Sequence, residues 1–333
     1  MSRIATALGV VALLSVAAGS SLATTFTFTN IIDPANPTFT QALGVNSSNV
    51  VVGYGNAVNF NGFQVTAPFA PGNFTRENFP NPSPPPSVLP TQVIGIDAAG
   101  DTVGFYVTNP AVGTTSGFGR AAGGNFIPVN QSGFVFNQAL GVNQAGTEIV
   151  GYSSTDPAGM TGQQAFTFNR TSFTNINPLL PTNLNSQAVG VNNADNVVGF
   201  YQYNGAGDFS AFLDNSGTIS SFQFPGSIST QALGINDSGD IVGDYVASNG
   251  DMFGFLDDAG VFSTLDPFGS VSVTANGIND AGHVVGFYTD AANDTTVGFE
   301  ATTTPEPASL LLFGTGLAGL GLVLMRRRQR ETA

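Results

Sequence analysis

Apolar and polar residues alternate in short runs along most of this chain, and Asp, Asn and Gly interrupt the runs. The runs are rich in Val, Ile, Thr, Phe and Tyr. Alternation with a period of two is typical of a β-strand with one buried face, and no helical period appears between 24 and 304. Turn sequences such as Asp-Ala-Gly at 280–282 separate the runs, which is typical of hairpins. The pattern therefore predicts an all-β protein of short antiparallel strands.

One short segment recurs along the chain and divides it into repeats. It reads Gln-Ala-Leu-Gly-Val-Asn in two copies, and its glycine recurs every 43 to 51 residues. The six glycines are Gly44, Gly95, Gly141, Gly190, Gly234 and Gly277. A second glycine follows nine or ten residues later, and further apolar segments follow that glycine. Each repeat therefore predicts a four-stranded meander of about 46 residues, which matches the size of a propeller blade.

The two ends of the repeat array complement each other. The sixth repeat stops after its third strand, at 297–300, whereas an additional strand at 25–30 precedes the first repeat. Pairing between these strands would leave no free strand edge in a ring of blades. The sequence therefore predicts a six-bladed β-propeller, closed by the N-terminal strand, with 24–304 as one domain.

The repeat also predicts where each strand lies. The first strand carries Ala and Gly, which suit the crowded centre of a ring, and the later phenylalanines suit the wider space between blades. Five glutamines begin the first strands, and we expect them to hydrogen-bond neighbouring blades or, alternatively, to ring the mouth of the channel. They are Gln41, Gln92, Gln138, Gln187 and Gln231.

Residues 1–23 differ in character from the repeats. An apolar run from 4 to 18 follows Arg3, and the segment ends in Ser-Leu-Ala. Small residues at the third and first positions before the cut are those that signal peptidase accepts. The segment predicts a signal peptide cleaved after Ala23 by signal peptidase, with an N-terminal membrane anchor as the alternative.

The C-terminal segment, 305–330, has three parts. The first part is the triplet Pro305, Glu306 and Pro307. An uncharged stretch at 308–325 follows, and as a helix it would be about 27 Å long, close to the roughly 30 Å hydrocarbon core of a bilayer. The third part is the basic cluster Arg326, Arg327 and Arg328. The pattern predicts a transmembrane helix at 308–325 with its basic end in the cytoplasm and 24–304 outside.

This order of parts resembles the PEP-CTERM sorting signal of Gram-negative bacteria, mostly those that make exopolysaccharide. The resemblance implies that an exosortase, a membrane-embedded cysteine transpeptidase, recognises the triplet and cuts near it, which would place the product at the cell surface or in the extracellular matrix. A plain tail anchor is the alternative. The repeats also resemble the extracellular HAF type at 164–166 and 210–214, without the histidine that names those repeats.

Composition narrows the classes of function. The 333-residue chain has no cysteine and no lysine, and 24–304 holds 20 acidic residues against three arginines, a net charge of −17. A nucleic-acid partner is excluded because neutralising phosphates requires Lys or Arg. Without cysteine there are no disulfides, thiolate nucleophiles or Cys-ligated zinc, and without lysine there is no Schiff-base chemistry.

Few residues remain that offer catalytic or metal chemistry. His283 is the only histidine, and other repeats carry other polar residues at its place in a hairpin, which predicts a solvated turn rather than a catalytic base. Asp237 and Asp240 bring several oxygen atoms into one turn and are weak candidates for calcium, the one cofactor considered. Most other acidic residues fall in turns, where Asp bonds the backbone.

The sequence thus favours a non-catalytic binding or structural protein, with exopolysaccharide or other surface proteins as partners. The alternative is a secreted glycan hydrolase or lyase that uses Asp and Glu in the propeller channel. Two carboxylates at one mouth of the channel would favour the enzyme, whereas a neutral or aromatic mouth would favour a binding module.

Overall fold

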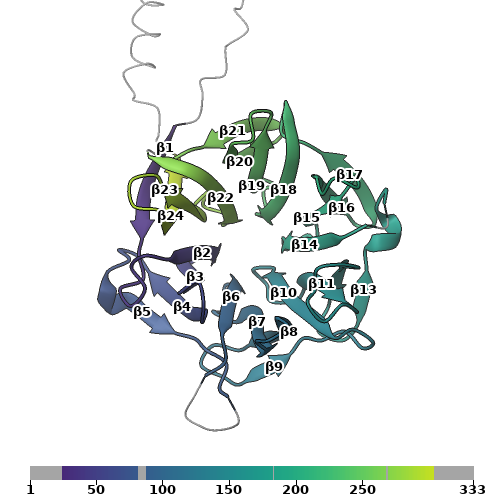
Figure 1. Ribbon diagram of the computed structural model, residues 1–333, viewed down its shortest axis with the longest axis horizontal. Coiled ribbons are helices and arrows are strands. Elements are labelled where there is room, and N and C mark those ends of the chain that lie inside the picture. The colour runs from purple at the N-terminus through teal and green to yellow at the C-terminus, as the bar shows by residue number, and fades with distance from the viewer. Residues whose placement is uncertain (1–24, 82–87, 183, 268, 304–333) are drawn as a thin grey trace, which may run out of the picture.

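The computed structural model describes residues 25–81, 88–182, 184–267 and 269–303. Its strands are arranged around a common centre (Figure 1), so the predicted all-β class is confirmed. The predicted signal peptide and the sorting segment with its predicted helix lie outside the described residues. Within the described part of the chain, no helix combines the length and the apolar character needed to cross a membrane.

Four separate sheets each contain four antiparallel strands in meander order. The first contains β2 (Thr40–Val45), β3 (Val50–Gly55), β4 (Asn61–Thr66) and β5 (Phe74–Arg76). The second contains β6 (Thr91–Ile96), β7 (Thr102–Asn109), β8 (Thr114–Arg120) and β9 (Phe126–Pro128). The third contains β10 (Phe136–Val142), β11 (Ile149–Ser154), β12 (Gln164–Phe168) and β13 (Phe173–Asn175). The fourth contains β14 (Ser186–Val191), β15 (Val197–Gln202), β16 (Phe209–Asn215) and β17 (Thr218–Phe222).

A fifth sheet contains eight strands and corresponds to the fifth and sixth repeats. The fifth repeat comprises β18 (Ser227–Ile235), β19 (Ile241–Ala247), β20 (Met252–Asp258) and β21 (Val261–Leu265). The sixth comprises β22 (Ser270–Ile278), β23 (Val284–Asp290), β24 (Thr295–Thr303) and the N-terminal β1 (Phe26–Ile31). One parallel pair, between Met252 and Ser272, joins the two halves. Two short 3-10 helices, Pro71–Asn73 and Asn177–Leu179, complete the described elements.

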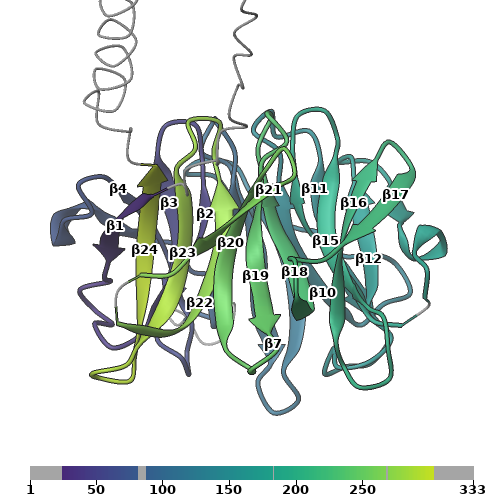
Figure 2. The ribbon, with the colours of Figure 1, turned by 90° about the horizontal axis from the view of Figure 1, so that it is seen from above.

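The first strand of the described chain pairs with the last one. β1 runs antiparallel to β24, with Phe26 opposite Thr303 and Ile31 opposite Gly298. The two strands lie side by side in both ribbon views (Figures 1 and 2). The predicted pairing between the additional N-terminal strand and the third strand of the sixth repeat is therefore confirmed.

Each repeat buries one phenylalanine completely on its third strand. These residues are Phe63, Phe118, Phe166, Phe212, Phe255 and Phe299, each 0% exposed. Each lies opposite the second-strand glycine of its own repeat, as Phe166 lies opposite Gly151. A Cβ atom on Gly151 would come within 2.9 Å of the Phe166 ring and 2.0 Å of a backbone oxygen of β10. The second glycine of the repeat is therefore required for packing, because the aromatic ring lies directly on its backbone and leaves no room for a side chain.

Replacing this glycine should damage the core. We expect Gly151→Ala to lower the free energy of unfolding by about 3 kcal/mol or more, because the new methyl group overlaps backbone that cannot move away alone. Gly72→Ala is the control, since a Cβ there meets no atom within 4 Å, and it should stay within about 0.5 kcal/mol of wild type. Urea unfolding measures both variants. Equal midpoints would contradict this account of the core.

Candidate functional site at the central channel

Six glycines bring the first strands into contact around the centre of the molecule. They are the glycines of the recurring segment: Gly44, Gly95, Gly141, Gly190, Gly234 and Gly277. A Cβ atom on Gly44 would lie 2.3 Å from the carbonyl oxygen of Ile94 in the next repeat. A Cβ atom on Gly277, in the sixth repeat, would lie 3.2 Å from the Cα atom of Gly44 in the first. Larger residues would therefore push neighbouring first strands apart.

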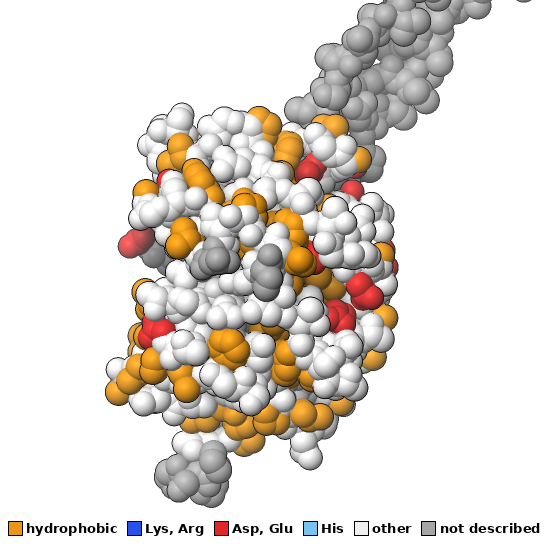
Figure 3. All heavy atoms as spheres, turned by 90° about the vertical axis from the view of Figure 1, so that its right-hand side faces the viewer, with side chains coloured by type: hydrophobic (Ala, Val, Ile, Leu, Met, Phe, Trp, Pro, Cys, Tyr) orange, Lys and Arg blue, Asp and Glu red, His pale blue; other side chains and the backbone are white. Residues whose placement is uncertain are grey.

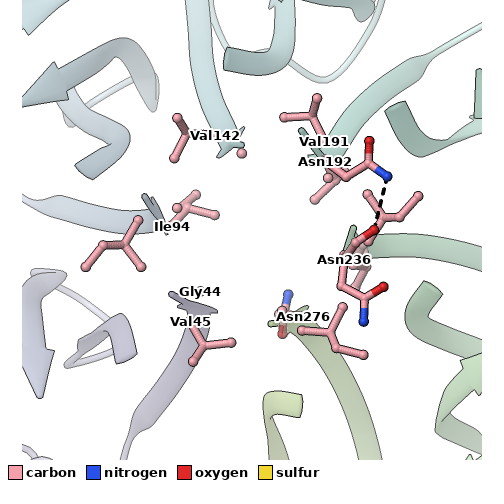
Figure 4. A pocket seen from close by; sticks show the side chains of 18 of the residues that line it. Gly44, Val45, Ile94, Val142, Val191, Asn192, Asn236 and Asn276 are labelled. Carbon is pink, nitrogen blue, oxygen red and sulfur yellow. Dashed lines mark hydrogen bonds between the residues drawn. The ribbon is translucent and has the colours of Figure 1, made fainter. Parts of the chain in front are cut away.

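The channel inside this ring is narrow. A cavity of about 60 Å³ lies on the axis, lined mainly by Gly, Val, Leu and Ile. Val45, Ile94, Val142 and Val191 surround the opening, and the polar Asn276 lies among them (Figure 4). A cavity of this size has room for only a few water molecules. The channel itself therefore does not accommodate a sugar ring.

Six buried polar side chains mark one end of the channel, which we call the asparagine end. They are Asn46, Asp97, Asn143, Asn192, Asn236 and Asn279, each between 1% and 4% exposed. The Asn46 amide donates to the carbonyl of Asp97 at 2.9 Å, and Asn192 bonds the carbonyl of Asn236 at 3.0 Å (Figure 4). Asn279 bonds the carbonyl of Asn46 at 3.0 Å and so joins the sixth repeat to the first.

Four asparagines make the bonds between repeats that we had expected of the glutamines, namely Asn46, Asn192, Asn236 and Asn279. Asn143 instead donates to Thr147 in its own turn. Among the described residues, Gln187 alone of the five glutamines makes a side-chain hydrogen bond to a neighbouring repeat, to Gln163 at 3.0 Å. The side chains of the other four make no hydrogen bond in the described part of the chain and are half-buried at the opposite end, which we call the glutamine end. The expected inter-blade bonding is therefore wrong for those four. The sequence could have identified these residues, because every copy of the recurring segment ends in Asn or Asp.

Two carboxylates lie at the asparagine end, beside the cavity. Asp237 and Asp280 both line it. Asp280 accepts a hydrogen bond from the backbone N–H of Asp237 at 2.8 Å, and Asp237 accepts two from Asn193, at 2.8 and 2.6 Å. Asp240 instead accepts a hydrogen bond from the amide of Asn236 at 2.8 Å. The two calcium candidates, Asp237 and Asp240, therefore bind different amides, and no group of three His, Cys, Asp or Glu side chains suited to a metal occurs among the described residues.

His283 has a carboxylate partner on the sheet, although its side chain is still 32% exposed. Its Nδ1 atom lies 2.7 Å from Oε1 of Glu300, a residue of β24 that is 8% exposed. Its backbone N–H donates to the side chain of Asn279 in the predicted hairpin turn. The turn is thus confirmed, and Glu300 reaches its histidine from the next strand.

The three arginines between 24 and 304 are all used within the fold. Arg76 forms an ion pair with the fully buried Asp33. Arg120 lies 3.2 Å from the buried Glu77. Arg170 donates from Nε to a backbone carbonyl at 2.6 Å. Figure 3 shows one side of the molecule, where acidic side chains are scattered and no basic side chain is visible.

Aromatic side chains accompany the glutamines at the glutamine end. In five repeats the residue opposite the first-strand glutamine or threonine is aromatic: Tyr54, Phe105, Tyr152, Phe200 and Phe287. In the fifth repeat this position is Asp244, which is 5% exposed. Burial raises the pKa of the Asp244 carboxyl to about 7. Four of the five aromatic residues are buried, at 6% to 7% exposure, so this set of side chains packs inside the fold, and Asp244 is its one carboxyl group.

Exposed apolar side chains also gather at this end. Loops at the glutamine end connect second to third strands and fourth strands to the next repeat. Most of the exposed large apolar residues lie on them or on the strand starts beside them: Ile32, Val58, Val88, Val112, Val135, Met160, Leu179, Leu184, Tyr203, Ile228 and Val271. Ile127 and Val261 are the others among the described residues, and Val261 begins β21 at the opposite end. The two faces of the molecule therefore differ in exposed apolar surface.

The chain leaves the described structure from the asparagine end. β24 runs parallel to β22, because both pair antiparallel with β23. Ile278, at the end of β22, and Ala301, near the end of β24, both pair with Val284. The arrowhead of β24 and the connection between β7 and β8 lie at opposite faces (Figure 2). The segment after Thr303 therefore starts on the face opposite the glutamine end.

Comparison with family models identifies the C-terminal segment. The model of the PEP-CTERM protein-sorting motif matches residues 303–328. This match contains the predicted triplet at 305–307 and the arginines at 326–328, so the predicted sorting signal is confirmed. The motif implies export, a surface or extracellular location, and an exosortase as processing partner. No curated protein matches the chain in sequence.

Solved structures show similarity in fold. TolB from Acinetobacter baumannii has a TM-score of 0.51 and 8% identity over 81% of this chain and 66% of its own, just under two thirds. A structural genomics protein of unknown function from Bacteroides thetaiotaomicron has a TM-score of 0.51 and 12% identity over 84% and 76%. The β-propeller domain of the Trilobed protease from Pyrococcus furiosus has a TM-score of 0.45 and 7% identity over 80% and 97%. The likeness to TolB, together with meander sheets arranged around a common centre, shows that this chain has the fold of a β-propeller.

Removal of one asparagine amide should test the inter-repeat bonds. We expect Asn279→Ala to lower the free energy of unfolding by about 1–3 kcal/mol, because the carbonyl of Asn46 and the N–H groups of the Asn279 turn lose buried partners. Asn59→Ala, at an exposed side chain, should change it by less than about 0.5 kcal/mol. Chemical denaturation of both variants decides the matter, and similar losses in both would be inconsistent with a role for the amide.

Asp244 should make stability depend on pH. Its folded pKa of about 7 exceeds the ordinary value of 3.8, so between these pH values the folded protein holds a proton that the unfolded chain releases. Stability should therefore fall as pH rises through this range and level off above it. Relative to wild type, Asp244→Asn should gain on the order of 2 kcal/mol between about pH 4 and pH 8. Denaturant titrations across that range measure the gain, and a constant difference would refute it.

Proposed function

We propose that this chain is an exported protein of the cell surface or exopolysaccharide matrix, and that its propeller binds a surface protein without catalysing a reaction. The observation that carries the proposal is the position of the exposed apolar side chains at the glutamine end, on the face opposite the start of the sorting segment. Exposed apolar side chains that are concentrated on one face favour an interaction surface there. A chain held at the membrane by its sorting segment would present this face outward.

We further infer that the propeller has six blades, with the eight-stranded sheet counted as two. Three contacts between the two ends of the array support this count. β1 pairs with β24, Gly277 lies against Gly44, and Asn279 bonds the carbonyl of Asn46. The repeats would then be of the extracellular HAF type that their sequence resembles, which agrees with an exported protein.

The channel gives little support to a catalytic role. Its cavity of about 60 Å³ is too small for a saccharide, and the carboxylates beside it accept backbone hydrogen bonds. One observation nevertheless favours a second candidate function, a glycan hydrolase or lyase. Asp237 and Asp280 place two carboxylates at one mouth, and glycosidases act with two carboxyl groups.

Binding and catalysis can be separated in one set of experiments. Full-length protein would be tested for binding to outer-surface proteins and to exopolysaccharide of the host, and for release of reducing ends. We expect binding to a surface protein that Val58→Asp with Val112→Asp weakens at least tenfold, because charges replace apolar contacts at the glutamine end. Val261→Asp, on the opposite end, is the matched control and should bind as wild type does.

The other outcomes assign the function differently. Binding to polysaccharide alone would replace the protein partner with a glycan. Release of reducing ends that disappears in Asp237→Asn with Asp280→Asn would establish the enzyme instead.

A further inference from the structure

The fifth and sixth repeats each depart from the pattern at one position. Asp244 occupies the position that is aromatic in the other repeats. Asn276 occupies a position that is Leu, Ile or Val in the others. Phe105 and Leu140, the equivalents of this pair in the second and third repeats, belong to one buried cluster. Repeat equivalence therefore places Asp244 beside Asn276, between β19 and β22.

The packing of the two strands supports this placement. Val242, which lies two residues before Asp244 on β19 and hence on the same face, packs with Val273 and Ala275 of β22. Tyr245 points to the other face of β19, into a cluster with Phe255. The side of β19 that carries Asp244 therefore faces the sixth repeat.

Each of the two side chains has an oxygen atom without a hydrogen-bond partner in the region between β19 and β22, which we call the seam. The Oδ1 atom of Asn276 is buried and accepts no hydrogen bond from the described residues. Asp244 is only 5% exposed, and its carboxyl group forms no hydrogen bond or ion pair within the described part of the chain. An ionised carboxylate that is nearly buried and has no hydrogen-bond partner is costly in a protein interior. The ionised form of Asp244 therefore needs a cation or a hydrogen-bond donor beside it.

A third oxygen lies within reach of the solvent. Gln231 is directly opposite Asp244 on the neighbouring strand β18. Its side chain is half-buried at the glutamine end and makes no hydrogen bond among the described residues. The amide can therefore supply a ligand atom and marks a route from solvent to Asp244.

We propose that Asp244, Asn276 and Gln231 bind a small hard cation in the seam between the fifth and sixth repeats. One carboxylate and two amide carbonyl groups are oxygen ligands of the kind that Ca²⁺ prefers, and Ca²⁺ tolerates irregular geometry with water completing its shell. The cation would supply the positive charge that the seam lacks. It would also link the fifth and sixth repeats, whose strands are otherwise joined by the single parallel pair between Met252 and Ser272.

A proton competes with the cation for the same carboxylate. The elements packed around Asp244 bring no second charge to it. β18 and β22 have no titratable residue, and the acidic residues of β20 lie opposite Ile241 and beyond, toward the asparagine end. On β23, Tyr288 is buried in the adjoining apolar cluster and Asp290 ends the strand. Binding should therefore strengthen as the pH rises above the pKa of Asp244, about 7.

Thermal melting and calorimetry of the full chain test this site. Millimolar Ca²⁺ should raise the melting temperature by about 5 °C at about pH 8.5 and by much less at about pH 5.5. Titration calorimetry should count one ion per chain. Asp244→Asn and Asn276→Leu, the latter restoring an apolar residue of the other repeats, should both remove the shift and the binding heat.

The control variant keeps the seam and changes the turn that the sequence suggested for calcium. Asp237→Asn with Asp240→Asn should leave the shift intact. A shift produced by Mg²⁺ or K⁺ instead, and lost in the same seam variants, would support the site and identify a different hard cation. No shift at about pH 8.5 with any of these ions, or a shift that survives in Asp244→Asn, would overturn the proposal.

Discussion

The close approach of backbones at the centre is the constraint on which this fold depends. Each first strand carries a glycine that lies against the first strand of the next repeat, and the contact between Gly277 and Gly44 links the ends of the array. Every other regular feature follows outward from there. The second-strand glycine provides room for a phenylalanine ring, and that ring fills the space that widens between neighbouring repeats.

The asparagines complete this arrangement by serving two purposes at once. Each side-chain oxygen holds its own hairpin turn, as Asn279 accepts from two backbone N–H groups of its turn, while the amide of Asn279 reaches the first repeat. A buried side chain with one acceptor and two donors can meet both demands, which an aspartate cannot. The second repeat has Asp97 at this position, and there burial raises the pKa of the carboxyl.

Features set by the repeat could be predicted from the sequence, and features of single repeats could not. The strand order, the inner glycines and the pairing of β1 with β24 follow from spacing alone. The partnership of His283 with Glu300 occurs once and depends on a cross-strand register. The glutamines were assigned the wrong bonds because a half-buried amide at a channel mouth can be satisfied by water. The sequence shows that Asp244 follows the second glycine where the other repeats carry an aromatic residue, but only the structure shows that Asp244 is buried.

The two ends of the channel are suited to different work. Turns at the asparagine end are tied to one another by bonds such as those from Asn193 to Asp237 and from Asp237 to Asp280, so none can rearrange alone. Loops at the glutamine end carry exposed apolar side chains, including Val58 and Met160. A partner therefore gains buried apolar area at the glutamine end without breaking the bonds that hold the ring. The sorting segment, which must reach a membrane enzyme, leaves from the rigid end.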